Sequence, residues 1–218
     1  MRKKKKIDKT LEEEKEEIVK PDTKKDTKKL VIVILFIISL FAVFFVAKYI
    51  FSSKLNYPSY TYNGFTFVKI QGLWHTNWQR GNELFSVHLR YGPKESEDVL
   101  IFSKEENEIF NVTDDLYITF DPGLNLKYVA LAASELSLNL FRVFNITPIA
   151  ACTQNLTTSC HDRPIITCDN TDEAVIYLKE ASPTKIILES NCVTIQGEGE
   201  ELVRAADKVV WIQYGIIR

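Results

Sequence analysis

Hydrophobic and polar positions divide the chain into one long apolar run followed by shorter, mixed patterns. Residues 30–47 are eighteen consecutive residues without a charge, and Ser39 is the only polar side chain among them. As a helix, about 18–20 apolar residues cross a hydrocarbon core of about 30 Å. We therefore expect residues 30–51 to form a transmembrane helix in contact with membrane lipid. A cleaved signal peptide is the alternative, although its apolar region usually has only about 7–15 residues.

Between residues 60 and 120, apolar and polar residues alternate with the period of half-buried strands. The dipeptides Asn63-Gly64 and Gly81-Asn82 separate such segments, and they are typical of two-residue hairpin turns. Alternating strands joined by tight turns predict an antiparallel β-meander over residues 60–124.

From residue 125 the pattern changes to helices and strands in alternation. Residues 126–144 have a wide apolar face at the helical period, and residues 200–213 are amphipathic. Asn170 and Glu173 have the spacing of a capping box, which predicts a helix over residues 172–181. Apolar segments predict strands at residues 146–152, 164–168, 184–190 and 191–197. The segment 164–188 would then form a βαβ unit.

Together these patterns predict a mixed α/β (α+β) fold with an N-terminal transmembrane helix. Residues 1–29 are expected to be a disordered basic tail, and residues 52–59 a linker. The remaining 60–218 would form one domain, with the meander in residues 60–124 and α/β layers in residues 125–218. A domain of about this size can bury a single core.

Charge indicates the orientation of the predicted helix. Residues 1–29 contain 12 Lys and Arg and 8 Asp and Glu, so the tail carries +4. The whole chain carries −2 and Lys48 adds +1, which leaves −7 for residues 52–218. Basic residues beside a span favour the cytoplasmic side, so we expect a cytoplasmic N-terminus and an extracytoplasmic C-terminus. An acidic outer domain does not favour a nucleic-acid partner.

All four cysteines fall in the predicted outer domain, and an even number in an exported domain indicates two disulfides. We favour Cys152–Cys160, which closes a polar loop, and Cys168–Cys192, which joins neighbouring strands. A four-cysteine zinc site is the alternative, but structural zinc sites usually pair cysteines two to four residues apart. The cysteines here are farther apart, so we expect no metal.

Three sequons for N-glycosylation also fall in the outer domain, and chance alone would supply about one or two. Asn111 and Asn155 are the candidate acceptors, because Thr147 of the third sequon, at Asn145, precedes a proline.

Signatures of known catalytic motifs are missing, and no cofactor is indicated. His75 and His88 pair across a symmetric hairpin, as solvated side chains or as half of a metal site. Asp121 and Asp169 each follow a predicted strand, where sites assemble in α/β sheets. With His161 nearby in sequence, they are candidate catalytic residues. Turn and cap chemistry is the alternative for both carboxylates, and we favour it over a catalytic role.

Aromatic residues offer candidate binding surfaces. Trp74 and Trp78 share one face of a strand, where they either bind a ligand or pack in the core. Trp211 falls with Arg204 and other charged residues on the wheel of the last helix. If this face is exposed, it would bind a protein partner or a second copy. Truncation of Trp211 should then change the stability of the domain little. Cover of Trp211 by Lys208, or packing of Trp211 on the meander, is the alternative.

Six segments resemble those of uncharacterised single-pass membrane proteins of archaeal type. They are YNGFTF, YITFDP, YVALAASELSLNL, PIAAC, RPIITC and NCVTIQGEGEELVRAAD. The resemblance covers most of residues 60–218 and implies a prokaryotic cell envelope with the domain facing outward. It implies no activity and no site residue.

The sequence thus predicts a membrane-anchored, extracytoplasmic binding or assembly component of the cell envelope. The alternative is an envelope hydrolase or transferase that uses Asp121 and Asp169. Paired carboxylates of this kind must converge within about 10 Å of each other.

Overall fold

The computed structural model divides the chain into two units, Met1–Asn56 and Tyr57–Arg218, which are described separately below. The residues it describes are 23–52, 57–103, 115–123, 126–189 and 191–217. Residues 1–22 of the predicted disordered tail lie outside these ranges, as does Asn111.

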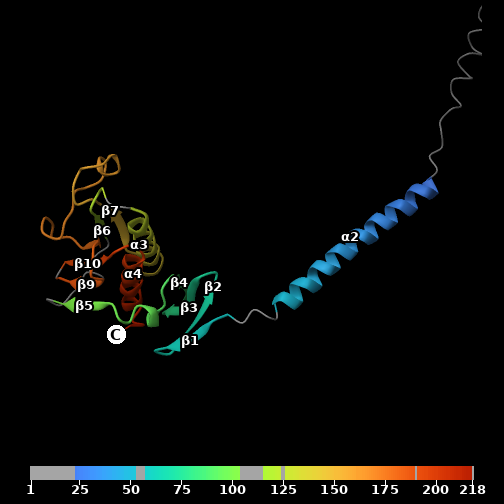
Figure 1. Ribbon diagram of the computed structural model, residues 1–218, viewed down its shortest axis with the longest axis horizontal. Coiled ribbons are helices and arrows are strands. Elements are labelled where there is room, and N and C mark those ends of the chain that lie inside the picture. Colours follow the sequence, from blue (N-terminus) through green and yellow to red (C-terminus); the bar gives the residue numbers. More distant parts are fainter. Residues whose placement is uncertain (1–22, 53–56, 104–114, 124–125, 190, 218) are drawn as a thin grey trace, which may run out of the picture. The chain divides into compact units, whose positions relative to one another are not determined.

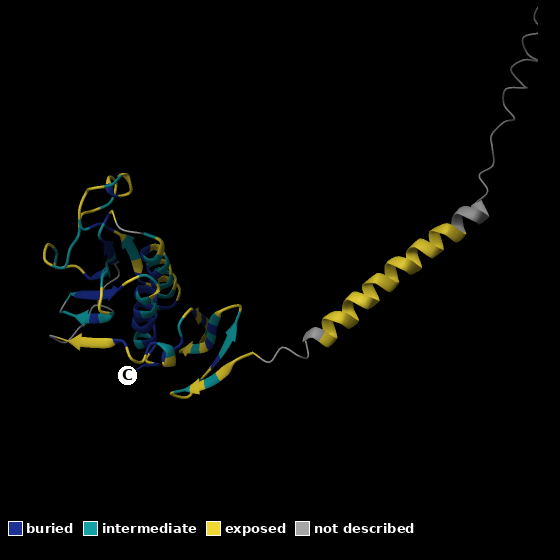
Figure 2. Ribbon diagram, viewed as in Figure 1, coloured by how far each residue is buried: buried dark blue, intermediate teal, exposed yellow. Residues whose placement is uncertain are grey.

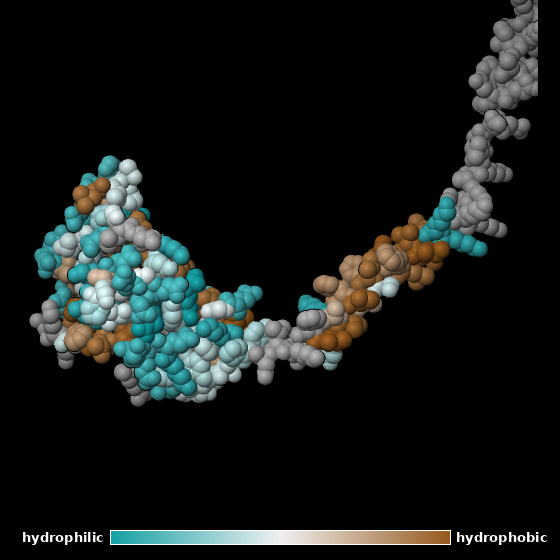
Figure 3. Space-filling view, in the orientation of Figure 1, coloured by the Kyte–Doolittle hydropathy of each residue, from teal (hydrophilic) through white to brown (hydrophobic). Residues whose placement is uncertain are grey.

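The first unit contains the apolar helix α2 (Thr23–Ser52). Its segment Lys28–Ile50 has the length and composition of a membrane span or a signal sequence. At 1.5 Å per residue these 23 residues extend over about 34 Å. All side chains from residue 28 to residue 50 are exposed (Figure 2), and the surface of this segment is apolar over most of its length (Figure 3). The helix begins at Thr23, so the prediction of disorder through residue 29 is wrong for residues 23–29.

Sheet A of the second unit is the predicted antiparallel meander. The dipeptide Asn63-Gly64 forms its first turn, with φ of 46° and 85°, and Gly81-Asn82 forms its last. Both predicted hairpins are therefore confirmed. The strands, in spatial order, are β1 (Ser59–Tyr62), β2 (Phe65–Ile70), β3 (Leu73–Arg80) and β4 (Glu83–Leu89).

Sheet B is mixed, because β9 runs antiparallel to β10 while the other described pairings are parallel. In spatial order its strands are β5 (Leu100–Ser103), β9 (Lys185–Leu188), β10 (Cys192–Gly197), β8 (Val175–Glu180), β6 (Asp115–Phe120) and β7 (Thr147–Ala150). The prediction that β5 and β6 belong to the meander is therefore wrong. They pair instead with strands that come much later in the chain.

Two helices lie between the sheets (Figure 1). Helix α3 (Leu126–Asn139) continues as the π-helical turn η3 (Leu140–Phe144), and α4 (Glu200–Gln213) has the predicted bounds. Two short 3₁₀ turns, η2 (Pro93–Glu95) and η4 (Thr158–Cys160), complete the elements. Gly197 permits the tight junction of β10 with α4, because a Cβ there would lie 2.5 Å from the amide nitrogen of Leu202.

The predicted helix over residues 172–181 is wrong, because this segment contains strand β8 between β10 and β6. Residues 175–178, Val-Ile-Tyr-Leu, are β-branched, aromatic or large, and a strand buried on both faces favours such residues. Tertiary pairing thus overrides the local capping signal. The strand expected at residues 164–168 is reduced to one bridge between Cys152 and Ile165, so the predicted βαβ unit over residues 164–188 does not form.

Trp211 is fully buried, and the prediction that it is exposed is wrong. Its ring packs edge-on against Phe67 of β2, with 5.4 Å between the ring centroids. Its Nε1–H donates a hydrogen bond to the carbonyl of Tyr91, at 2.8 Å. The cause is the position of α4, which contacts sheet B on one side and sheet A on the other. A helix covered on both sides buries its charged face as well as its apolar face.

The charged residues of α4 satisfy the backbone of the irregular segment after β4, residues 90–99. Lys208 Nζ donates to the carbonyls of Glu97 and Val99, at 2.9 and 2.7 Å. Arg204 donates to the carbonyl of Glu95 at 3.0 Å, and it forms ion pairs with Glu201 and Asp98. Arg204 is thus a packing residue of α4, and its side chain is only 15% exposed.

Trp74 and Trp78 also point inward, so the interpretation of their face as a binding surface is wrong. Trp74 is buried and its Nε1–H donates to the carboxylate of Glu95, at 2.7 Å. Half-buried Trp78 donates to the carbonyl of Tyr214 just after α4, at 2.9 Å. Trp74 therefore connects sheet A to the segment after β4, and Trp78 connects it to the residue after α4.

We predict that Trp211→Ala destabilises the domain by about 3–5 kcal/mol, the usual cost of removing a buried Trp. The free energy of unfolding should be measured by urea denaturation. Leu84→Ala is the control, because Leu84 is 67% exposed and its truncation should change stability by only about 0.5 kcal/mol. Equal effects of the two variants would contradict the burial of Trp211.

Candidate functional site

The carboxyl end of β6 is where the topology of sheet B favours a site. Strand β6 lies between β7 and β8, and all three strands are parallel. Helix α3 connects β6 to β7, which makes a βαβ unit. In α/β sheets ligands bind at the carboxyl ends of parallel strands, and Asp121 follows β6 directly at this end.

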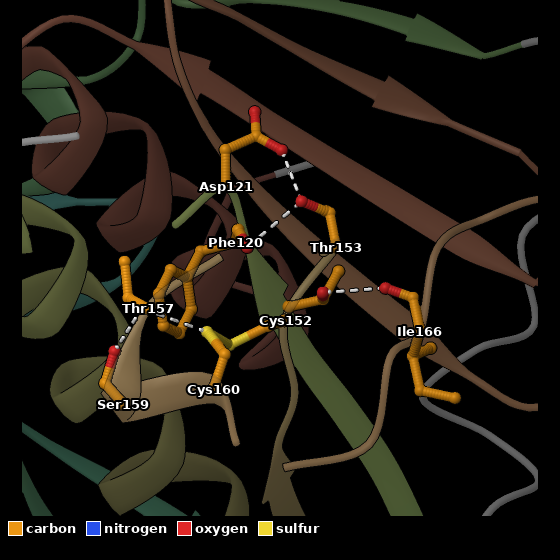
Figure 4. Close-up of a disulfide and its surroundings, with 9 residues drawn as sticks. Phe120, Asp121, Cys152, Thr153, Thr157, Ser159, Cys160 and Ile166 are labelled. Carbon is orange, nitrogen blue, oxygen red and sulfur yellow. Dashed lines mark hydrogen bonds between the residues drawn. A yellow bond between two sulfur atoms is a disulfide. The ribbon is translucent and has the colours of Figure 1, made fainter. Parts of the chain in front are cut away.

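Asp121 accepts hydrogen bonds from two hydroxyl groups, one on strand β8 and one in the segment after β7. Its Oδ1 accepts a hydrogen bond from the Thr153 hydroxyl, and its Oδ2 accepts one from the Tyr177 hydroxyl, both at 2.6 Å. Figure 4 shows Thr153 between Asp121 and the carbonyl of Phe120. Burial and the Asp121 carboxylate raise the pKa of Tyr177, so this phenol stays a hydrogen-bond donor. The network ties β8 and the segment after β7 to the end of β6.

Asp169 and His161 do not belong to this network. Both side chains are exposed, and Asp169 lies in a turn rather than at the end of a strand. Within the described part of the chain, Asp121 accepts hydrogen bonds from Thr153 and Tyr177 instead. The arrangement therefore offers no support for a carboxylate pair formed by Asp121 and Asp169.

Both predicted disulfides are present. Cys152–Cys160 closes the loop after β7, and this loop lies beside Phe120 (Figure 4). Cys168–Cys192 connects the later part of segment 151–174 to the first residue of β10. Backbone hydrogen bonds hold the first loop in place, since Ile166 N donates to the carbonyl of Cys152 at 3.0 Å. Thr119, on the face of β6 opposite α3, donates to the carbonyl of Ile166 at 2.7 Å. This segment therefore covers the face of sheet B that the helices leave open.

An apolar cleft of about 280 Å³ opens beside this loop, between α3 and the strands β6 and β7. Small side chains on one face of α3 (Ala130, Ala133 and Ser137) leave the space free. Arg163 lies at the rim, with its guanidinium 5.7 Å from the centroid of the Phe120 ring. The other lining residues are Ile118, Phe120, Leu126, Val129, Pro148, Ala150 and Ser159.

A second, polar cleft of about 200 Å³ lies on another face of α3, against β3 and β4. Its two walls are rows of side chains set by the periods of a strand and a helix. One row is Ser86, His88 and Arg90, and the other is Leu131, Glu135, Leu138 and Arg142. Leu73, Ser134 and Asn139 complete the lining.

Glu135 joins this polar cleft to a buried carboxyl group on α4. Its Oε1 accepts from Arg90 Nε at 2.9 Å, while its Oε2 is buried and directed to Asp207, which is fully buried. Asp207 Oδ2 accepts from the amide of Tyr91 at 2.8 Å. Burial and the neighbouring Glu135 raise the pKa of Asp207 well above its ordinary value. Asp207 Oδ1 and Glu135 Oε2 are both buried, and the described residues supply no hydrogen-bond donor to either oxygen.

The predicted pairing of His75 with His88 is confirmed, and the ring centroids are 5.5 Å apart. Burial, then His75, then Arg142 lower the pKa of His88. A cationic neighbour disfavours a bound metal cation at this pair. Among the described residues, Cys168, Glu189 and Cys192 also gather potential ligand atoms within 4.8 Å. The two cysteines form a disulfide there, which leaves no thiolate to bind a metal.

Of the two sequon asparagines that we favoured, Asn155 is exposed in the loop closed by Cys152–Cys160, where a glycan has access. Glu135 and Arg163 were not identified from the sequence. The acidic Glu135 interrupts an apolar helical stretch, and that interruption was the available signal. The sequence contains no signal for Arg163, because its contact with Phe120 depends on how the loop folds.

The chain matches no protein-family model, no curated protein and no solved structure.

We predict that the stability of the domain falls as pH rises above about 4, the ordinary pKa of an aspartate. The folded state holds the Asp207 proton more tightly than the unfolded state, so unfolding releases a proton in this range. The slope from this group is at most about 1.4 kcal/mol per pH unit. Urea denaturation across a pH series should show a flatter dependence for Asp207→Asn.

Asp98→Asn is the matched control, because the contribution of Asp98 to stability changes with pH in the opposite direction. The hydrogen bond from Arg204 lowers the pKa of Asp98, so its contribution is present at neutral pH and is lost in acid. A pH dependence that is the same in Asp207→Asn and in the wild type would show that Asp207 does not hold the proton.

Proposed function

We propose that this protein is a membrane-anchored, extracytoplasmic binding component of the cell envelope. Its domain would take an apolar group of a ligand or partner into the cleft between α3 and β7. The observation that carries the proposal is this apolar cleft, which lies beside the carboxyl end of a parallel strand.

The anchor and the location outside the membrane are supported by independent features. Helix α2 is apolar on all sides and long enough to cross a membrane. Two disulfides fit an oxidising compartment. Basic residues precede the helix, which favours a cytoplasmic N-terminus.

The size of the cleft limits what it can hold. Ligand sites usually have volumes of about 300–1,000 Å³, whereas a cavity of about 150 Å³ accepts benzene. With about 280 Å³, the cleft fits a ring system or a short chain rather than a large ligand. Arg163 at the rim would favour a ligand with a negative or aromatic group next to its apolar part.

Orientation is tested by adding protease to intact cells, or to spheroplasts if there is an outer membrane. We expect loss of the domain that begins at Tyr57 and protection of the basic tail. An epitope at each end should be followed by immunoblotting, with detergent-lysed cells as the control for cleavage. Protection of the C-terminal epitope in unlysed cells would contradict the proposed topology.

Binding in the cleft is tested with 1-anilinonaphthalene-8-sulfonate, an anionic aromatic probe whose fluorescence rises in apolar surroundings. We expect Ala133→Phe to weaken binding at least about tenfold, a change of about 1.4 kcal/mol, because the new ring fills the cleft. Leu84→Phe is the control, since it adds a ring at an exposed position of β4. Equal affinity of the two variants would place the probe elsewhere.

A further inference from the structure

The polar cleft between β4 and α3 brings positive charge to one place. His88 and Arg90 lie two residues apart along β4 and its continuation, so both face the cleft. Arg142 approaches from the end of η3, on the opposite wall. Ser86 adds a hydroxyl group on the same face as His88.

We infer that this cleft binds an oxyanion, a carboxylate or a phosphate group, held by Arg142, His88 and Arg90. The site is separate from the apolar cleft and does not depend on a ligand there. Arginine is suited to this role because its planar fork can donate two parallel hydrogen bonds to such a group.

The charge of the lining residues supports an anion as the occupant. Among the described lining residues Glu135 is the only carboxylate, and Arg90 neutralises it through the contact of 2.9 Å. The other oxygen of Glu135 is directed away from the cleft, to the buried Asp207. The described residues supply no acidic partner to Arg142. The cleft thus keeps a net positive charge, and protonation of His88 would add to it.

The pKa of His88 responds to the groups around it. Burial lowers this pKa most, His75 and Arg142 lower it as well, and Glu135 acts to raise it. A bound anion would oppose the effects of His75 and Arg142 and would favour the protonated imidazole, which then donates a hydrogen bond to the anion. The volume of about 200 Å³ corresponds to about seven waters at about 30 Å³ each. A small acid group with part of its hydration shell therefore fits.

The test uses the full chain in a neutral detergent, with its three histidines isotopically labelled for NMR. Sodium phosphate is titrated against sodium chloride at equal ionic strength. We expect saturable shifts of the His88 and His75 resonances with phosphate, a rise in the pKa of His88, and no response of His161. Arg142→Gln should weaken phosphate binding at least about tenfold. Lys94→Gln, which removes an exposed cation that lines neither cleft, should leave phosphate binding unchanged.

Sodium acetate and dihexanoylphosphatidic acid, as further titrants, distinguish a carboxylate, a free phosphate and a lipid headgroup. The site is supported if any of these anions produces saturable shifts that are lost in Arg142→Gln. The anion that does so identifies the chemical class of the ligand. Arg142 is exposed, so the variant should fold, and unchanged resonances of buried amides verify this. The inference is overturned if chloride produces the same shifts, if no anion shifts His88, or if Arg142→Gln binds as tightly as the wild type.

Discussion

Helix α4 is the element on which the rest of the domain depends, because it is covered on both sides. Its apolar face contacts β8 and β10, and its other face contacts sheet A and residues 90–99. A helix in that position must satisfy its charged side chains inside the protein, since an unpaired buried charge costs several kcal/mol. Lys208 and Arg204 meet this requirement by donating to backbone carbonyls.

The same contacts explain how the chain passes from one sheet to the other. Residues 90–99 leave the meander after β4 and reach β5 without regular hydrogen bonding to a neighbouring strand. Backbone groups buried in such a segment need partners. Side chains of α4 supply donors for the carbonyls of Tyr91, Glu95, Glu97 and Val99. The charged face of α4 is therefore part of the core, and its polarity reflects the backbone that it contacts.

Sequence patterns predicted the individual helices, strands and turns better than the way in which these elements pair and pack. The hairpins of sheet A, the bounds of α4 and both disulfides followed from turn residues, helical period and the number of cysteines. Pairing over long distances in sequence was not visible, so β5 and β6 were assigned to the wrong sheet and β8 was taken for a helix. Trp211 was misplaced for the same reason, since a helical wheel shows which residues share a face but not what covers that face. Asp121 follows strand β6 as predicted, but its contacts with Thr153 and Tyr177 could not be predicted, because they depend on the order of the strands in sheet B.

The two helices between the sheets have different roles, and this difference indicates where function lies. Most residues of α4 are buried, so its side chains mainly serve stability. Helix α3 leaves two of its faces partly open, and each face forms the wall of a cleft. One face is small and apolar, whereas the other carries Glu135 and leads to Arg142. Substitutions at Ala130, Ala133 and Ser137 change a surface outside the core, whereas Glu135 also contacts the buried Asp207. Helix α3 is therefore the element on which binding can vary without loss of the fold.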